Sequence, residues 1–274
     1  MINWAGPEEY GLRLGKKPAV ASPSKFALWS YFDQDLPDPP DFFRHLHPPI
    51  WQDYDNKLCG NCVFAAAANL TRLWYHEAEL PSPGFTARTV TDDYGAVTGY
   101  PTTDEGTDVD DGMKYWRQVG MHDMNGNRHQ IDAYAWITLD NMKYLRAAVW
   151  TLGSVGVGFL MPDYGMEDFM SGYDWTYRRR RGNIVGGHFA PCVGIASNGD
   201  LICVSWGREI HMSEKFYREY ADEVIGIIDL DRVHKSTNKT PEGFDEARLR
   251  KDLKTIAKNG RVYVANLDRN KRFA

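Results

Sequence analysis

The sequence predicts an α+β protein, with helices dominating the first half of the chain and an antiparallel sheet the second. Hydrophobic residues follow helical spacing before about residue 131 and alternate as in strands after it. The Asn198-Gly199 pair lies between two strand-like runs and is a strong hairpin signal, because Asn-Gly accepts positive φ. A chain of 274 residues with 43% hydrophobic and 25% charged residues can bury a sizeable core, which excludes intrinsic disorder.

Residues 1–55 are rich in proline and aromatic residues. Five prolines within residues 37–49 exclude a helix there, so this segment is expected to be an extended arm that lies over the domain. The first residues lack the basic start and apolar run of a secretory signal. No apolar stretch reaches the length of about 18 residues needed for a membrane helix. Cytoplasmic residence is therefore the expectation.

The predicted elements follow in order. A mostly buried helix begins after Asn61, which is expected to cap it, and ends before Pro81. Residues 89–108 are expected to form a loop, and a second helix runs near 108–119. A strand, a short helix and four further strands come next, and a helix and a short strand close the chain; their ranges are 131–139, 140–153, 154–162, 188–196, 200–207, 224–230, 242–258 and 261–267.

These elements suggest four consecutive parts. We expect the arm at 1–55, a helical half at 56–145, an antiparallel β half at 146–234 and a C-terminal helix-strand extension at 235–274.

Cys62 is the first candidate for chemistry. It falls in the first turn of the predicted central helix, where the positive helix end favours a thiolate, as a nucleophile requires. An inert buried cysteine is the alternative. Cys59-x-x-Cys62 is also compatible with a redox pair or half a zinc site, but no preceding βαβ pattern and no second CxxC support either. We therefore expect no metal and no cofactor. Cys192 and Cys203 are expected to be small buried thiols.

His188 is the second candidate. It follows Gly186-Gly187 at the start of a strand, where an imidazole beside a cleft can act as a general base. A single histidine is more often structural. A cysteine followed by a distant histidine is, however, a known nucleophilic arrangement, so Cys62 and His188 support each other.

With a third block, Val204-Ser205-Trp206-Gly207, the sequence resembles the papain-like cysteine peptidases. The family's cysteine block is matched by Cys59-Gly60-Asn61-Cys62 with Phe64-Ala65, and its histidine block by Gly187-His188. The order of the blocks agrees, with 126 residues from Cys62 to His188. Segments such as 115–121 and 186–188 resemble more closely a divergent group that is widespread in bacteria and their phages.

The resemblance implies a papain-like fold and roles for specific residues. Cys62 would be the nucleophile and His188 its base, with Gly60, Gly187 and Trp206 lining the cleft. The slot of the family's oxyanion glutamine holds Asn56, which is one methylene shorter, and Gln52 is a second candidate donor.

The slot of the family's histidine-orienting asparagine holds Val204, which cannot accept a hydrogen bond. A hairpin regular about Asn198-Gly199 has paired residue numbers that sum to 397. Because side chains alternate, His188 then shares a face with Ser205 and Cys203 and not with Val204. Ser205 is therefore the first candidate for the third member of the site.

Two functions follow as hypotheses. The first is a cysteine peptidase that hydrolyses peptide or isopeptide bonds and is encoded by a phage or a bacterium. The second is a catalytically weakened papain-like domain with a structural or interaction role, for example in a virion; a cleft blocked by the arm would favour it. A net charge of −5 gives no general attraction to nucleic acid or membranes. One dense basic run comprises Arg178, Arg179, Arg180 and Arg181. It is expected to be either a solvated loop or a contact for an acidic substrate, nucleic acid or an assembly partner.

Overall fold

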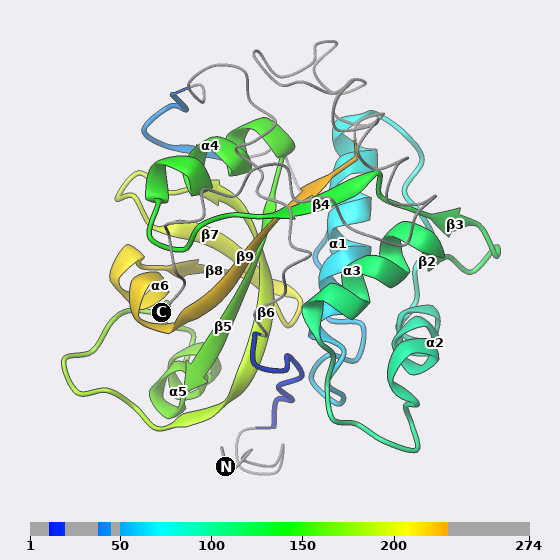
Figure 1. Ribbon diagram of the computed structural model, residues 1–274, viewed down its shortest axis with the longest axis horizontal. Coiled ribbons are helices and arrows are strands. Elements are labelled where there is room, and N and C mark those ends of the chain that lie inside the picture. The colour runs from blue at the N-terminus through cyan, green and yellow to red at the C-terminus, as the bar shows by residue number, and fades with distance from the viewer. Residues whose placement is uncertain (1–10, 20–37, 45–49, 230–274) are drawn as a thin grey trace, which may run out of the picture.

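The computed structural model describes residues 11–19, 38–44 and 50–229, and these residues form two packed halves (Figure 1). One half is helical, and a small hairpin joins it. Its elements are α1 (Cys62–Glu77), α2 (Ala87–Thr98), α3 (Val109–Gln118), β2 (Met121–His122) and β3 (Arg128–His129). None of the helices in the described part of the chain has the length and apolar character needed to span a membrane.

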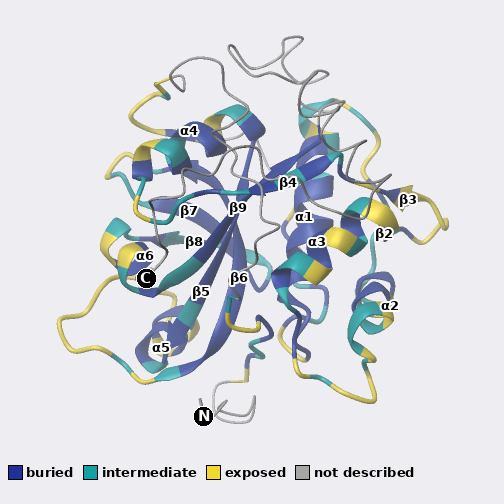
Figure 2. Ribbon diagram, viewed as in Figure 1, coloured by how far each residue is buried: buried dark blue, intermediate teal, exposed yellow. Residues whose placement is uncertain are grey.

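The central helix α1 is where the sequence predicts it, and it packs against α2, α3 and the sheet. Its alanines are small enough to let these neighbours approach on several sides, which explains why most of the helix is buried (Figure 2). Asn61 is the N-cap residue of α1, as predicted, but its side chain forms no capping hydrogen bond. Its amide instead donates to the carbonyl oxygen of Tyr54 at 2.8 Å and so fixes the loop that leads into the helix.

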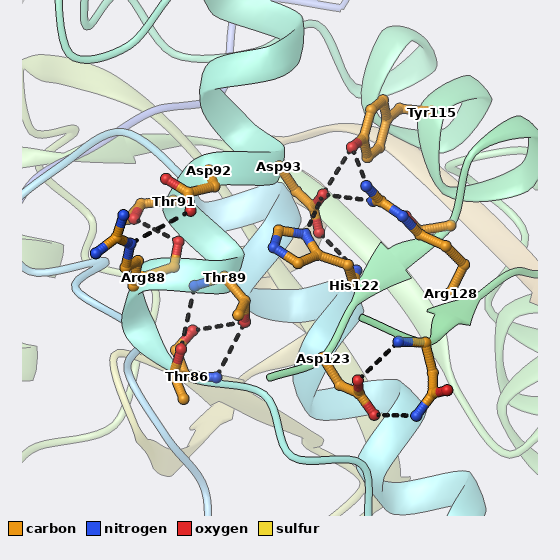
Figure 3. A network of polar contacts seen from close by, with 12 residues as sticks. Thr86, Arg88, Thr89, Thr91, Asp92, Asp93, Tyr115, His122, Asp123 and Arg128 are labelled. Carbon is orange, nitrogen blue, oxygen red and sulfur yellow. Dashed lines mark hydrogen bonds and ion pairs between the residues drawn. The ribbon is translucent and has the colours of Figure 1, made fainter. Parts of the chain in front are cut away.

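Helix α2 lies in residues for which the sequence predicts a loop, so that expectation is wrong. Thr86 and Thr89 form a capping box at its start, and Gly99 ends it in a left-handed conformation. The buried Asp93 carboxylate of α2 then accepts hydrogen bonds from the Tyr115 hydroxyl at 2.6 Å and from Arg128 at 2.9 Å (Figure 3). These bonds tie α2 to α3 and the hairpin.

The other half is a seven-stranded sheet in the order β4-β9-β5-β6-β7-β8, with β1 added to β6. Every pairing in it is antiparallel. Its strands are β1 (Phe43–Arg44), β4 (Ala133–Trp136), β5 (Val155–Pro162), β6 (Ile184–Ile195), β7 (Leu201–Ser205), β8 (Arg208–Met212) and β9 (Ala221–Ile228). The helices of this half are α4 (Met142–Leu152), α5 (Asp163–Met170) and α6 (Glu214–Tyr220). The sequence indicates neither α5 nor α6.

The β6–β7 hairpin turns at Asn198-Gly199 as predicted, but its expected register is wrong. Ile195 pairs with Leu201, and beyond a bulge Cys192 pairs with Cys203, so the partner numbers sum to 396 and then 395 instead of 397. The bulge absorbs one residue of β6. Cys192 and Cys203 therefore lie directly opposite each other, as free and buried thiols.

The expected division of the chain at 56, 146 and 235 stays a prediction. Strand β4 and helix α4 both pack within the sheet half. The predicted helix at 242–258 and strand at 261–267 lie outside the described residues, as does much of the predicted arm.

Candidate active site

Cys62 and His188 both lie where the helical half packs against the sheet. Cys62 is the first residue of α1, and His188 lies in β6, the strand against which α1 packs. The backbone N–H of Phe189, one residue after His188, is close enough to Cys62 to lower the pKa of its thiol. The fold therefore brings together two residues that are 126 positions apart in the sequence.

The Cys62 thiol is buried, with 2% of the residue exposed. Burial raises the pKa of Cys62 to about 11, and this outweighs the lowering by the N–H of Phe189 and by the charge of Lys16. In the arrangement described here, Cys62 is therefore a neutral thiol at physiological pH.

His188 is fully buried in a cage of aromatic rings. Its Nε2 lies 2.7 Å from the Ser205 hydroxyl, and Trp206 stacks on the ring with centroids 4.1 Å apart and planes 17° apart. Phe159 and Trp175 meet the ring edge-on. Burial lowers the pKa of His188 to about 3, so the imidazole is neutral.

The other ring nitrogen, Nδ1, is buried and has no hydrogen-bond partner among the described residues. Because Ser205 takes Nε2, Nδ1 is the nitrogen left for proton exchange. One ring nitrogen thus orients the imidazole and the other is unpaired. This is the arrangement expected of a histidine that acts as a general base.

Ser205 rather than Val204 lies beside the imidazole, although the predicted register is wrong. The observed and predicted sums differ by two beyond the bulge, so each side chain still lies on the predicted face. Val204 lies on the opposite face, in the apolar cluster that also contains Cys62 and Phe189. After Ser205 the chain turns sharply through positive φ at Trp206 and Gly207, and this turn places the indole over His188.

Among the described residues, neither of the two candidate oxyanion donors forms a hydrogen bond to Cys62. Asn56 is buried, and its amide donates to the Cys59 carbonyl at 3.3 Å. Gln52 is exposed and lines a pocket of about 280 Å³ in the helical half, which neither Cys62 nor His188 lines. Their proposed role as oxyanion donors stays a prediction.

A segment of the N-terminal arm covers the site. Residues 11–19 lie between the two halves (Figure 1), and the N–H of Gly15 is close enough to Cys62 to lower the pKa of its thiol slightly. Lys16 N–H donates to Gly187 O at 2.9 Å on the sheet side. On the helical side, Thr107 N–H donates to Gly15 O at 2.7 Å, and Lys17 N–H to Thr107 O at 3.0 Å. We call residues 13–17 the covering segment.

The covering segment fits closely because glycines face it. A β-carbon on Gly106 would lie 2.1 Å from Gly15 O, and one on Gly187 would lie 2.3 Å from Lys16 O. Gly60 is packed against Gly15 in the same way. Gly60 and Gly187, predicted to line the cleft, thus contact this segment. The sequence did not single out Gly15 or Lys16, because nothing local marks them.

The remaining predicted features lie elsewhere or stay untested. Arg178 pairs with Asp168 and Arg181 with Glu219, while Arg179 and Arg180 are exposed. A contact between this run and an acidic substrate, nucleic acid or an assembly partner stays a prediction. The Cys59 thiol donates to Asp55 O at 3.5 Å, and burial raises its pKa to about 12. Within the described residues no group of three or more metal-ligating side chains is found.

Comparisons with known proteins identify the fold. No family model matches the sequence, and no curated protein matches it by sequence. Among solved structures, xylellain, a cysteine protease from Xylella fastidiosa, is similar with a TM-score of 0.63 and 14% identity over 79% of this chain and 96% of that one. A structure from a study of the mite allergens Blo t 1 and Der p 1 has a TM-score of 0.55 and 12% identity, with 82% of each chain covered.

A third similar structure, procathepsin B from Trypanosoma congolense, has a TM-score of 0.50 and 11% identity over 81% of this chain and 87% of that one. The protein therefore has a papain-like fold, as the three sequence blocks predict. At identities of 11–14% the likeness establishes the fold alone.

The buried imidazole predicts an acid-sensitive fold. The pKa of His188 is about 3 in the folded protein and near 6.5 when unfolded, so the unfolded chain binds more protons between these values. This contribution to stability is complete above pH 6.5 and is lost as the pH falls towards 3. As the pH is lowered from 6.5, we expect the free energy of unfolding of the wild type to fall by about 1 kcal/mol per pH unit more than that of the His188→Gln variant. Urea unfolding at pH 6.5, 5.5 and 4.5 measures this; equal slopes would contradict it.

Ser205→Ala should slow any reaction of Cys62 that depends on His188. The change leaves the buried Nε2 without its partner and frees the ring to turn. We expect the rate of Cys62 acylation to fall about 10- to 100-fold, by analogy with the loss of an orienting group in serine enzymes. Ser205→Thr keeps the hydroxyl and is the matched control. The interpretation fails if alanine and threonine variants react equally fast.

Val204→Asn should not restore a family-like site. Val204 lies in the apolar cluster on the far face of β7, so an amide there is buried without facing His188. We expect a loss of about 1–3 kcal/mol in stability and no gain in turnover. A faster variant would show that β7 can shift its register.

Proposed function

We propose that the protein is a papain-like cysteine peptidase that hydrolyses peptide or isopeptide bonds. One observation carries the proposal. Among the described residues His188 is oriented through Nε2 and unpaired at Nδ1, and it lies in the strand against which the helix headed by Cys62 packs. A structural histidine in an apolar core would be expected to use both nitrogens.

The chemistry follows from these positions. In the proposed reaction, His188 Nδ1 takes the thiol proton of Cys62, and the thiolate attacks the carbonyl carbon of the substrate. His188 then returns the proton to the leaving amine, and water releases the acyl group from the sulfur. The N–H groups of Phe64 and Ala65 bond to Asn61 O, so the N–H groups of Cys62 and Val63 are the helix-end donors that the oxyanion would use.

The covered arrangement is a resting state in this proposal. With the pKa of Cys62 raised to about 11 and that of His188 lowered to about 3, both groups are neutral and the proton stays on sulfur. Burial is the main cause of both shifts. Displacing the covering segment admits water and substrate, which moves both pKa values back towards their ordinary range and favours proton transfer.

The covering segment also supports the second candidate, a structural or interaction protein without turnover. Both candidate catalytic residues are buried beneath backbone that is bonded to both halves. A domain that has lost its activity can keep its cleft permanently filled. A role in a virion is a hypothesis that belongs to this second candidate. Phage origin and cytoplasmic residence are hypotheses that apply to the peptidase as well.

Labelling of the full chain by a dipeptidyl acyloxymethyl ketone distinguishes the two candidates. We expect mass spectrometry to find Cys62 modified and the other three cysteines, which are fully buried, unmodified. His188→Ala should abolish the labelling, and Cys62→Ala is the control for site. Iodoacetamide, which needs no peptide cleft, reports accessibility alone. If neither wild type nor a variant with a displaced covering segment is labelled by the ketone, the peptidase proposal is wrong and the structural role is favoured.

A further inference from the structure

Lys16, in the middle of the covering segment, is fully buried, which is rare for a lysine unless it is paired. Its ammonium lies 2.8 Å from Asp222 Oδ2 and 3.2 Å from Glu223 Oε1, and it donates to the Lys17 carbonyl at 2.9 Å. These three acceptors match the three N–H donors of the ammonium. The side chain is therefore held as a specific ligand would be held.

The sheet half supplies the site that holds this side chain. Asp222 and Glu223 lie in β9, and Gly158 lies opposite Glu223 on β5. A β-carbon on Gly158 would lie 2.3 Å from Lys16 Cε and 2.8 Å from Glu223 Cγ. The glycine thus leaves the space that the lysine stem fills. We call Gly158, Asp222 and Glu223 the lysine pocket.

Backbone bonds place the lysine pocket beside the candidate reacting centre. Lys16 N–H bonds to Gly187 O, one residue before His188, and the adjacent Gly15 N–H lies close to the Cys62 thiol. Main-chain bonds of this kind hold an extended peptide of any sequence, while a side-chain pocket selects among sequences. The covering segment therefore shows how a peptide with a lysine would lie in the cleft.

The charges of the pocket favour a cation over any other side chain. Two carboxylates face one ammonium, and Asp222 Oδ1 is buried without a partner. An apolar side chain in this place would remove the ammonium that now faces the two carboxylates, of which Glu223 is 5% exposed, and it would put an apolar group against them, which is unfavourable. An acidic side chain would add a like charge.

We propose that the lysine pocket is a specificity site that binds a lysine side chain of a peptide substrate, and that Lys16 occupies it in the covered protein. That the bound peptide is a substrate rests on the proposed function, whereas the binding of its lysine side chain does not. Peptides with a lysine at this position are the class of ligand that the cleft selects.

Direct binding tests the proposal without any need for turnover. The protein is the full chain carrying Gly15→Ala and Lys16→Ala, because a β-carbon on residue 15 would lie 2.0 Å from Gly60 O and so displaces the covering segment. The probes are two fluorescent peptides with the sequence of residues 12–18, one natural and one with norleucine for Lys16. They differ only in the ammonium group. Fluorescence anisotropy gives both dissociation constants.

We expect the lysine peptide to bind about 10- to 100-fold more tightly than the norleucine peptide, the range for hydrogen bonds to charged groups. Adding Glu223→Gln or Asp222→Asn should reduce this ratio to near one. Adding Glu167→Gln, which removes an exposed carboxylate elsewhere, should leave it unchanged. If circular dichroism shows that the double variant is unfolded, the Lys16→Ala single variant is measured with the same two peptides.

Equal affinities for the two peptides, or no binding of either, would overturn the lysine pocket. A preserved preference for lysine combined with no ketone labelling of Cys62 supports the pocket and overturns the peptidase function. Labelling of Cys62 by the ketone, combined with equal affinities for the two peptides, supports the peptidase function and overturns the lysine pocket. The two failures are thus distinguishable.

Discussion

Gly15→Ala should expose the candidate active site and raise the rate of Cys62 labelling by about 100-fold or more. The added β-carbon would lie 2.0 Å from Gly60 O and 2.2 Å from Gly60 C, and both are backbone atoms that cannot rotate away. The segment must therefore move, and the bonds from Lys16 to Gly187 and between Thr107 and Gly15 break with it. Losing two or three such hydrogen bonds costs about 1 kcal/mol each, and the clash adds to this.

The measurement is the second-order rate of labelling of the full chain by the dipeptidyl ketone. Lys17→Ala is the matched control, because it truncates an exposed side chain of the same segment and keeps every backbone bond. Its rate should equal that of wild type. Should Gly15→Ala also leave the rate unchanged in a folded protein, the segment does not limit access to Cys62.

Trp206→Ala should cause the largest loss of stability, about 3–5 kcal/mol. The indole is 4% exposed, stacks on His188 and meets Phe169 with ring centroids 4.6 Å apart. Its Nε1 also donates to Arg13 O at 3.3 Å, so the change removes one anchor of the N-terminal segment. Domains of this kind are stable by about 5–15 kcal/mol, so the variant should be close to its limit at 37 °C.

The same variant should raise the pKa of His188. Burial alone holds it at about 3, and removing the stacked ring admits water to one face of the imidazole. We expect the value to move towards 6.5 in an NMR titration. Trp150→Ala is the control, because that indole is 42% exposed and its truncation should cost less than about 1 kcal/mol. Equal losses for the two variants would mean that Trp206 does not support the site.

Strong periodicity made part of this fold predictable. The apolar run after Asn61 and the Asn198-Gly199 turn both appear where the sequence places them, since helix burial and turn chemistry are local properties. Helix α2 was missed because its residues are polar and contain Gly95 within a Gly- and Thr-rich stretch. The pair Thr86 and Thr89 was the signal that could have revealed its start.

The candidate site likewise contains residues that the sequence could predict and residues that it could not. Short motifs marked Cys62, His188 and Ser205, and alternation along a strand was enough to put Ser205 on the correct face despite the bulge. The partners of Lys16 were beyond reach, because its carboxylates lie 206 and 207 positions later and no local pattern connects them. Long-range charge pairing leaves no trace in a single sequence.

The pairing of β4 with β9 has a consequence for synthesis on the ribosome. Ala133 pairs with Ile228, so this edge strand of the sheet has no partner until 95 further residues have been made, which takes about 5–20 s at common elongation rates. The helical half contains Cys62, and α1, α2 and α3, which contact one another, are all synthesised before β4. Residues 13–17 leave the ribosome before either half. Cys62 therefore emerges when the covering segment is already part of the growing chain, and His188 in β6 follows it by 126 residues.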